Sequence, residues 1–253
     1  MEPTDKRGKA GPSTRTPDRD HGAAAPVAAD VAGGHPFGPH AAAILATEHW
    51  SLLGSRSLIW NEALSRATVF LTVLSASIIA LALLADATGF GSQTTMVALV
   101  LLPVVLLLGV ATYVRLVQIN REEVKLELAM NRLRHAYLKI EPGLEPYFTT
   151  GHHDDERGLQ VTYMENPPSR RWRWLLVYFL LNTPTIVATV VAALAAAIAV
   201  LVLQIAEVPR AAVVAGGVVA FLAVWGGLMP LQRHSVDPLR DTTPRFPTPP
   251  DTP

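Results

Sequence analysis

The sequence predicts an all-α membrane protein with four transmembrane helices, a cytoplasmic antiparallel helical hairpin that forms a stalk, and disordered termini. Half of the 253 residues are hydrophobic and only 17% are charged, whereas a soluble domain carries about 25% charged residues. Charged residues are absent from four segments, 67–85, 87–114, 174–206 and 211–232. Each segment reaches roughly the 20 apolar residues that a helix needs to cross a bilayer.

Residues 1–40 are predicted to form a disordered cytoplasmic tail. They are polar, and their basic residues, prolines and glycines recur without helical or strand periodicity. They also lack the apolar run that follows the basic start of a cleavable signal peptide. We therefore expect the first transmembrane helix to act as an uncleaved insertion signal.

Residues 41–140 are predicted to contain a cytoplasmic helix, a first span at 67–85, a short external loop, a second span at 94–114 and a returning cytoplasmic helix. The two cytoplasmic arms, 41–66 and 115–140, have 26 residues each. At a rise of about 1.5 Å per residue, each arm is about 39 Å long. Equal length on one side of the membrane favours antiparallel packing of the arms.

Each arm carries residues at alternating spacings of three and four, which predicts a coiled-coil seam. The seams are Trp50, Leu53, Ser57, Trp60 and Leu64 in the first arm, and Ile119, Glu123, Leu126, Met130, Leu133, Tyr137 and Ile140 in the second. We expect the seams to face each other, with Trp60 beside residues 118–122, Trp50 beside residues 129–132, and both indoles covering the second seam. Pairing with other subunits is the alternative. The charged residues expected on the solvated outer face of the second arm are Arg121, Glu122, Lys125, Glu127, Arg132 and Arg134.

The layout of residues 41–140, with a cytoplasmic helix, two closely spaced spans and a returning helix, resembles the two-transmembrane SLATT modules. These modules are proposed to be membrane effectors in bacterial conflict systems. The resemblance rests on layout and on no specific residue string, and it implies an assembly that acts as a regulated pore. As a whole, the chain resembles bacterial four-span integral membrane proteins, with the alanine-, arginine- and proline-rich composition of a GC-rich genome.

The cytoplasmic loop at 141–173 holds the candidate metal site. The candidate ligands are His152, His153, Asp154 and Asp155, followed by Glu156. Imidazole and carboxylate groups are the ligand types of divalent cation sites. Adjacent residues seldom bind one metal together, so an exposed acidic loop tip is the alternative.

Residues 174–232 are predicted to contain the third span at 176–204 and the fourth at 211–231. The third span includes Asn182, Thr183, Pro184 and Thr185, a proline with polar neighbours that can cover freed backbone groups. A kink that serves helix packing is one interpretation of this group. A constriction that lines a pore is the other.

Residues 233–253 are predicted to form a proline-rich, disordered cytoplasmic tail. The strip from Thr243 to Pro253 is typical of an extended polyproline-like conformation and contains three Thr-Pro steps. These steps could be kinase sites or a ligand for a proline-reading module. A solvated tail without a ligand is the alternative.

The sequence offers little chemistry on which an enzyme could depend. It contains no cysteine, no glycine-rich phosphate loop and no Ser–His–Asp pattern, so no catalytic residue and no cofactor are predicted. The spans lack the ionisable side chains that pumps generally need. The net charge of zero gives no indication of nucleic-acid binding.

We therefore expect a non-enzymatic membrane scaffold or effector. Its partners would be the lipid bilayer, further copies of the chain in a homo-oligomer, and a cytoplasmic protein that the stalk and loop recruit or sense. A transporter or channel subunit for a small solute is the alternative function. An enzyme of the membrane surface that uses residues 152–156 is the third.

The distribution of basic residues predicts a multi-pass protein of the inner (plasma) membrane with both termini in the cytoplasm. Of the 21 lysines and arginines, only Arg210 falls in a predicted external loop. Loops rich in basic residues stay in the cytoplasm.

Reporter fusions test this topology. Fusions at Gly91 and Val208 should give an external signal, whereas fusions at Gly151 and Pro253 should give a cytoplasmic one, because of the charge asymmetry. An external signal at Gly151 would overturn the topology.

Overall fold

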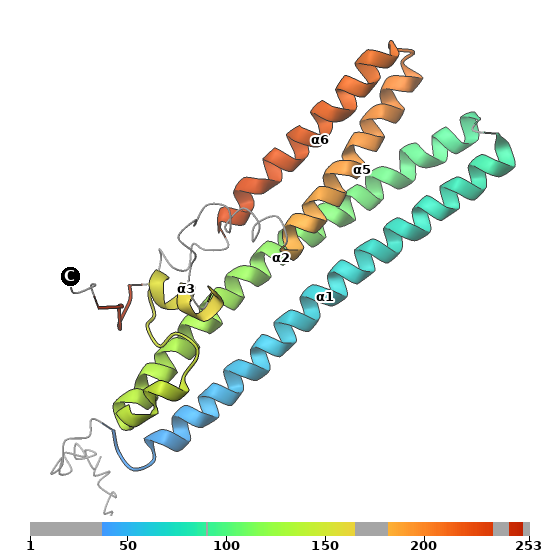
Figure 1. Cartoon of the computed structure of the whole chain (residues 1–253). Coiled ribbons are helices and arrows are strands. Elements are labelled where there is room, and N and C mark those ends of the chain that lie inside the picture. Colours follow the sequence, from blue (N-terminus) through green and yellow to red (C-terminus); the bar gives the residue numbers. More distant parts are fainter. Residues whose placement is uncertain (1–36, 90, 165–181, 235–242, 250–253) are drawn as a thin grey trace, which may run out of the picture. The chain divides into compact units, whose positions relative to one another are not determined.

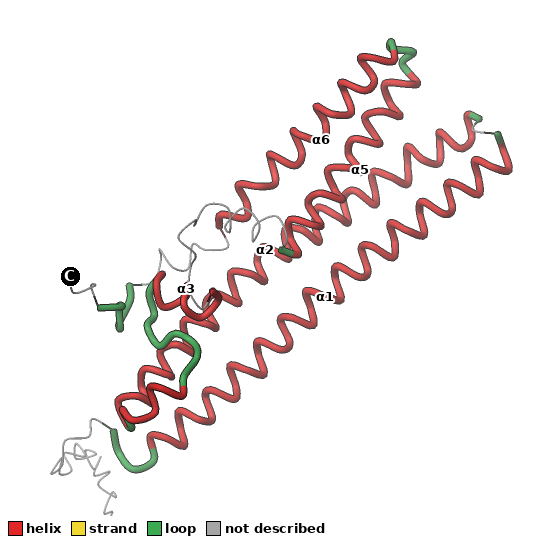
Figure 2. The backbone as a smooth tube through the Cα atoms, in the orientation of Figure 1, coloured by secondary structure: helices red, strands yellow, loops and turns green. Residues whose placement is uncertain are grey.

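The computed structural model describes residues 37–89, 91–164, 182–234 and 243–249, and these residues form helices and loops without a strand (Figures 1 and 2). The elements are α1 (Ala41–Thr88), α2 (Ser92–Ile140), η1 (Pro142–Tyr147), α3 (Glu156–Met164), α5 (Thr183–Ile205) and α6 (Arg210–Arg233). Most of the predicted N-terminal tail, the start of the predicted third span and part of the predicted C-terminal tail lie outside the described residues.

Four of these helices, α1, α2, α5 and α6, are long and apolar enough to cross a membrane. In α1 only 11% of the most apolar window is buried within the chain. Exposed valine and leucine side chains on this scale need an apolar solvent, and a helix satisfies its own backbone groups there. The prediction of an all-helical chain with four membrane-length helices is confirmed.

Helices α1 and α2 run without a break through the predicted spans and arms, over 48 and 49 residues. Helix α1 ends at Thr88, and the next residue, Gly89, has a left-handed φ of 71° and donates its N–H to the Ala85 oxygen. Helix α2 ends at Ile140, because Glu141 precedes Pro142 and takes an extended conformation. The two helices pack against each other along their length.

The main apolar core lies where α1, α2 and α5 meet. Phe70 of α1, Val105 of α2 and Val191 of α5 are all buried there. A Cβ atom at Gly109 of α2 would lie 2.7 Å from a ring atom of Phe70 and 2.7 Å from a methyl of Val191. Only glycine lets the three helices approach this closely.

Polar side chains join α6 to α5 and α2. The Gln232 amide donates to Asn182 Oδ1 at 3.1 Å and to Thr185 Oγ1 at 2.8 Å. The Tyr113 hydroxyl of α2 donates to the Leu228 oxygen of α6 at 2.6 Å. These bonds hold α6 against its two neighbours.

Among the described residues, Pro184 lies at the start of α5 and does not kink the helix. Asn182 has an extended backbone and caps α5, accepting a hydrogen bond from the Thr185 N–H at 2.9 Å. Pro184 therefore lies in the first turn of a helix, where a missing N–H costs nothing. The polar group marks the start of a helix.

The face of α1 that turns toward α2 differs from the predicted seam by one residue. The stripe of shielded positions runs through His49, Leu52, Arg56, Ile59 and Ala63, and Leu53 of the predicted seam is partly shielded beside it. The positions of the stripe keep the spacing of three and four, but one residue rotates the stripe by about 100° around the helix. Trp50 is 74% exposed and Trp60 is 46% exposed. The prediction that both indoles cover the second seam is therefore wrong.

Ion pairs explain why this face of α1, and not the predicted one, packs against α2. Arg56 forms ion pairs with Glu123 and Glu127 of α2, and Glu62 accepts a hydrogen bond from Arg115 Nε at 2.9 Å. A seam through Trp50 and Trp60 would turn these charges away from their partners. The pairs therefore set the rotation of α1.

Two charged residues of α2 lie inside the contact and do not lie on the predicted solvated face. Glu127 is 1% exposed, and the Arg134 side chain is 11% exposed. Burial raises the pKa of Glu127, while the charges of Arg56 and Arg134 oppose this rise. We predicted that Glu127 and Arg134 are solvated because we assumed that only apolar side chains face inward.

Removal of the Glu127 carboxylate should destabilise the arms. Glu127→Ala leaves Arg56 and Arg134 without their buried partner, which we expect to cost about 3 kcal/mol. Thermal unfolding in detergent, followed by circular dichroism, measures the effect. Lys125→Ala, an exposed change two residues away, is the matched control. Equal melting temperatures for both variants would show that the pair contributes nothing.

Candidate functional site

The candidate site is the loop between η1 and α3, which we call the aspartate loop (residues 151–155). The predicted metal ligands all lie in this loop. Asp154 is 2% exposed, and His152, His153 and Asp155 are partly buried. The alternative interpretation, an exposed acidic tip, is therefore wrong for this segment. The aspartates contact a second segment, 243–249, which we call the C-terminal segment.

Asp154 binds the backbone of the C-terminal segment. Its carboxylate accepts hydrogen bonds from the N–H of Phe246 at 2.7 Å and from the N–H of Arg245 at 2.9 Å. Arg132 Nε of α2 donates to the same carboxylate at 2.6 Å. The Asp154 N–H in turn donates to the Phe246 oxygen at 3.2 Å. The residue therefore pairs with the segment as both donor and acceptor.

Asp155 combines a local role with a role in binding. Its carboxylate accepts a hydrogen bond from the Gly158 N–H at 2.8 Å, as a residue at the start of a helix does. It also accepts hydrogen bonds from the backbone N–H and the hydroxyl of Thr248, both at 2.8 Å. The Asp155 carboxylate thus stabilises the start of α3 and binds the Thr248 side chain.

The Phe246 ring lies between groups of α2. The His135 ring stacks on it with centroids 4.1 Å apart and planes 20° apart, and Lys139 Nζ lies 4.9 Å from its centroid. His153 Nδ1 lies 3.2 Å from the Phe246 oxygen, as an N–H donor to that carbonyl. Stacking and a nearby cation favour an aromatic side chain at this position.

Two glycines let the aspartate loop pack against α3. A Cβ atom at Gly151 would lie 2.2 Å from the Gly158 oxygen, and one at Gly158 would lie 2.1 Å from the His153 oxygen. Both contacts are with backbone atoms, which cannot move aside. Larger residues at either position would push the loop off the helix.

A polar chain connects the aspartate loop to the charged contact between α1 and α2. Asn131 Nδ2 donates to the His153 oxygen at 2.9 Å, and Asn131 Oδ1 accepts from Arg134 Nη1 at 2.6 Å. Arg134 also lies 3.8 Å from Glu127. The loop and the arms therefore share one network.

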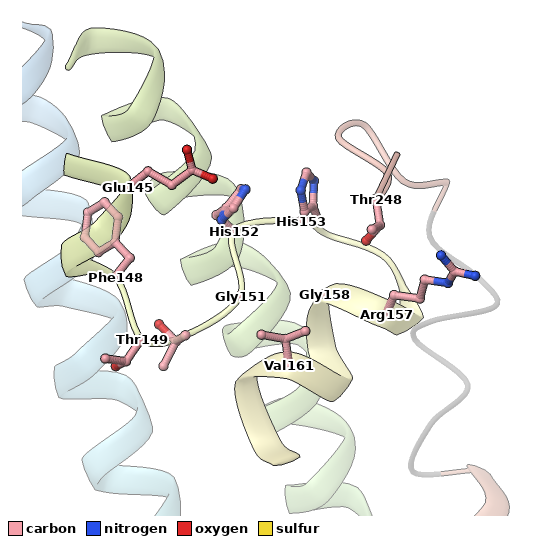
Figure 3. Close-up of a pocket in the computed structure, with 11 residues that line it drawn as sticks. Glu145, Phe148, Thr149, Gly151, His152, His153, Arg157, Gly158, Val161 and Thr248 are labelled. Carbon is pink, nitrogen blue, oxygen red and sulfur yellow. The ribbon is translucent and has the colours of Figure 1, made fainter. Parts of the chain in front are cut away.

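A cavity of about 280 Å³ opens beside the loop (Figure 3). Figure 3 shows His152 and Glu145 on one side, Val161 of α3 on another, and Thr248 of the C-terminal segment nearby. The cavity has both apolar and polar walls. It leaves room beside Thr248 for additional atoms.

Hydrogen bonds and burial shift the pKa values of the site in a consistent pattern. Burial acts to raise the pKa of Asp154, but hydrogen bonds from Arg245, Phe246 and Arg132 hold it below its ordinary value. Burial lowers the pKa of His135 and of His152. Neutral pH therefore favours a charged Asp154 beside a neutral His135 and a neutral His152.

The four predicted metal ligands lie together, but the two carboxylates have other partners. Among the described residues, no group of three or more His, Cys, Asp or Glu side chains is placed to hold a metal ion. Metal binding stays a prediction, which metal analysis of the purified protein tests. Sequence reasoning missed Asn131, Arg132, His135 and Phe246 as residues of this site, and it named Thr248 only as part of a Thr-Pro step. The regularly spaced prolines of the C-terminal tail were the one feature of the sequence that indicated a binding role for this segment.

Acidification should release the C-terminal segment. The pKa of His135 lies below 6.5 when the segment is bound. Release of the Phe246 ring removes part of the burial and moves the pKa of His135 up toward its ordinary value, so the free state takes up a proton more readily and binding weakens as pH falls through the histidine range. The charges of Lys139, His152 and His153 also lower the pKa of His135, whereas the charge of Asp154 acts to raise it.

A fluorophore on a cysteine introduced at Pro249 measures this release, since the chain has no other cysteine. Its anisotropy should fall between about pH 7.5 and about pH 5.5, which spans the ordinary histidine range. His135→Gln should reduce the change. A constant anisotropy would contradict the assigned role of His135.

The comparisons with known proteins identify no relative. No family model matches the chain, and no curated protein or solved structure matches it either. The resemblance of residues 41–140 to SLATT modules stays a prediction from layout. The function is therefore argued from the geometry of this chain.

Proposed function

We propose that the chain is a non-enzymatic scaffold or effector of the inner (plasma) membrane that forms homo-oligomers and couples a cytoplasmic stalk and loop to its membrane helices. The observation that carries this proposal is the continuity of α1 and α2. Each helix extends without a break from the predicted arms into the predicted spans. A continuous helix moves as a stiff element, so a displacement at one end reaches the other.

The contacts of the arms support coupling to the loop. Arg56 of α1 contacts Glu127 of α2, and Glu127 lies beside Arg134. Arg134 Nη1 also lies 3.4 Å from the Gly151 oxygen of the aspartate loop. A change in what the loop binds would therefore alter the surroundings of a buried charge between the arms. Buried charges respond strongly to such changes because little water screens them.

An exposed apolar stripe on α1 supports self-association. Trp50, Trp60 and Leu64 are all exposed, although they keep the spacing of a coiled-coil seam. The arms close on each other through a different face, so this stripe has no use within one copy. Exposed tryptophans at helical spacing are typical of an interface. A second copy of the same arm supplies a stripe of the same kind.

The rival function, a channel subunit for a small solute, draws on the polar group of α5 and α6. Asn182, Thr185 and Gln232 lie together at the ends of these helices. Their polar atoms hydrogen-bond one another, and Trp225 Nε1 donates to Thr189 Oγ1 at 3.2 Å. Such bonds are typical of packing between membrane helices. This geometry favours the scaffold over the channel.

The mass of the detergent-solubilised protein tests the proposed assembly. We expect an oligomer for the parent chain and a single chain for Trp50→Gln combined with Trp60→Gln, because the double change removes the apolar anchors. Leu58→Gln is the matched control, since Leu58 is 72% exposed but lies away from the stripe. A monomeric parent chain, or equal loss in the control, would contradict assembly through this stripe.

A further inference from the structure

The aspartate loop contacts the C-terminal segment as a peptide-binding site contacts its ligand. Residues 243–249 include three prolines, so only four of their residues carry a backbone N–H. The N–H groups of Arg245, Phe246 and Thr248 all donate to the carboxylates of Asp154 and Asp155. The acceptors of the site thus match nearly every backbone donor that the segment offers.

Side chains add selectivity to these backbone contacts. The Phe246 ring stacks on His135, and the Thr248 hydroxyl donates to Asp155 at 2.8 Å. Proline fixes φ, so the prolines around these residues restrict the segment before it binds, and the segment loses less conformational entropy on binding. The bound segment bends at Arg245 and Phe246. Backbone pairing with pockets for alternate side chains is a recurring mode of peptide recognition.

We propose that the aspartate loop, together with Arg132 and His135 of α2, is a recognition site for proline-containing peptides of the form Arg-Phe-Pro-Thr, and that the C-terminal segment occupies it in cis. This inference goes beyond the proposed scaffold function and does not depend on topology or oligomeric state. It names the ligand class of the loop and gives the proline-rich tail a partner. A protein with a similar exposed segment would compete for the same site.

Tethering makes the cis ligand a strong competitor. Only eight residues, 235–242, separate the C-terminal segment from the residue after α6. A tether of so few residues gives an effective concentration on the order of mM. A free peptide should therefore bind weakly to the parent chain and more tightly to a chain whose own segment is impaired.

Phosphorylation at Thr248 should abolish recognition. A phosphate removes the hydroxyl donor and adds about −1.5 to −2 charges at neutral pH. Asp154 and Asp155 would repel this charge at short range. The phosphorylated peptide is therefore a suitable negative control for binding to the site.

The binding experiment uses the full chain in detergent and a fluorescent synthetic peptide with the sequence of residues 243–249. Phe246→Ala weakens the cis segment and leaves the site intact, so the peptide should bind this variant at least about tenfold tighter than the parent chain. Adding Asp154→Asn should abolish binding, because the carboxylate that accepts two N–H groups is lost. Adding Glu141→Gln, an exposed change after the end of α2, should leave binding unchanged. The peptide phosphorylated at the position of Thr248 should not bind.

Trypsin cleavage after Arg245 provides a second readout that does not require the loop to tolerate substitution. The Arg245 and Phe246 N–H groups are bound to Asp154, so cleavage should be slow in the parent chain. Phe246→Ala and Thr248→Val change only the ligand and should both accelerate release of the terminal fragment severalfold. Equal cleavage rates in all three chains, with no peptide binding to Phe246→Ala, would overturn the proposal. A monomeric parent chain in the mass measurement would contradict the proposed assembly but not this proposal of a peptide-binding site.

Discussion

Glu127 lies in the contact between α1 and α2 with its carboxylate beside Arg56 of one helix and Arg134 of the other. A carboxylate that is 1% exposed is stable only where cations accompany it. Arg56 can reach it from one face of α1 alone, so this charge fixes the rotation of α1. Arg134 extends the same network to Asn131 and the aspartate loop. The arms and the loop therefore depend on one buried group.

The same physical rule acts again in the aspartate loop. Asp154 is nearly as buried as Glu127, but backbone N–H groups of the C-terminal segment accompany it together with Arg132. A buried carboxylate without donors is costly, so the segment is part of what stabilises the loop. Loop and segment form one unit in consequence. The tail of the chain thereby has a structural role that its composition does not reveal.

The fixed face of α1 leaves a second stripe for other contacts. Trp50 and Trp60 turn away from α2 once Arg56 and Ile59 turn toward it. One helix then presents a face of both charged and apolar residues to its own chain and exposed tryptophans outward, unlike an ordinary hairpin arm. This division connects the internal packing to the proposed assembly. It also explains how one short arm can serve both the packing within the chain and the proposed assembly.

The sequence by itself determined the four membrane-length helices and the end of α2 at Pro142, because hydrophobicity and proline geometry act locally. It also singled out residues 152–155 as unusual, although the partners of the two aspartates proved to be backbone N–H groups and the side chains of Arg132 and Thr248. Only the tertiary structure decided which stripe of α1 faces α2, since two stripes one residue apart both have seam spacing. That choice rests on Arg56 and Glu123, which are 67 residues apart. The partner of Asp154 is 91 residues away at Arg245, beyond the reach of any local pattern.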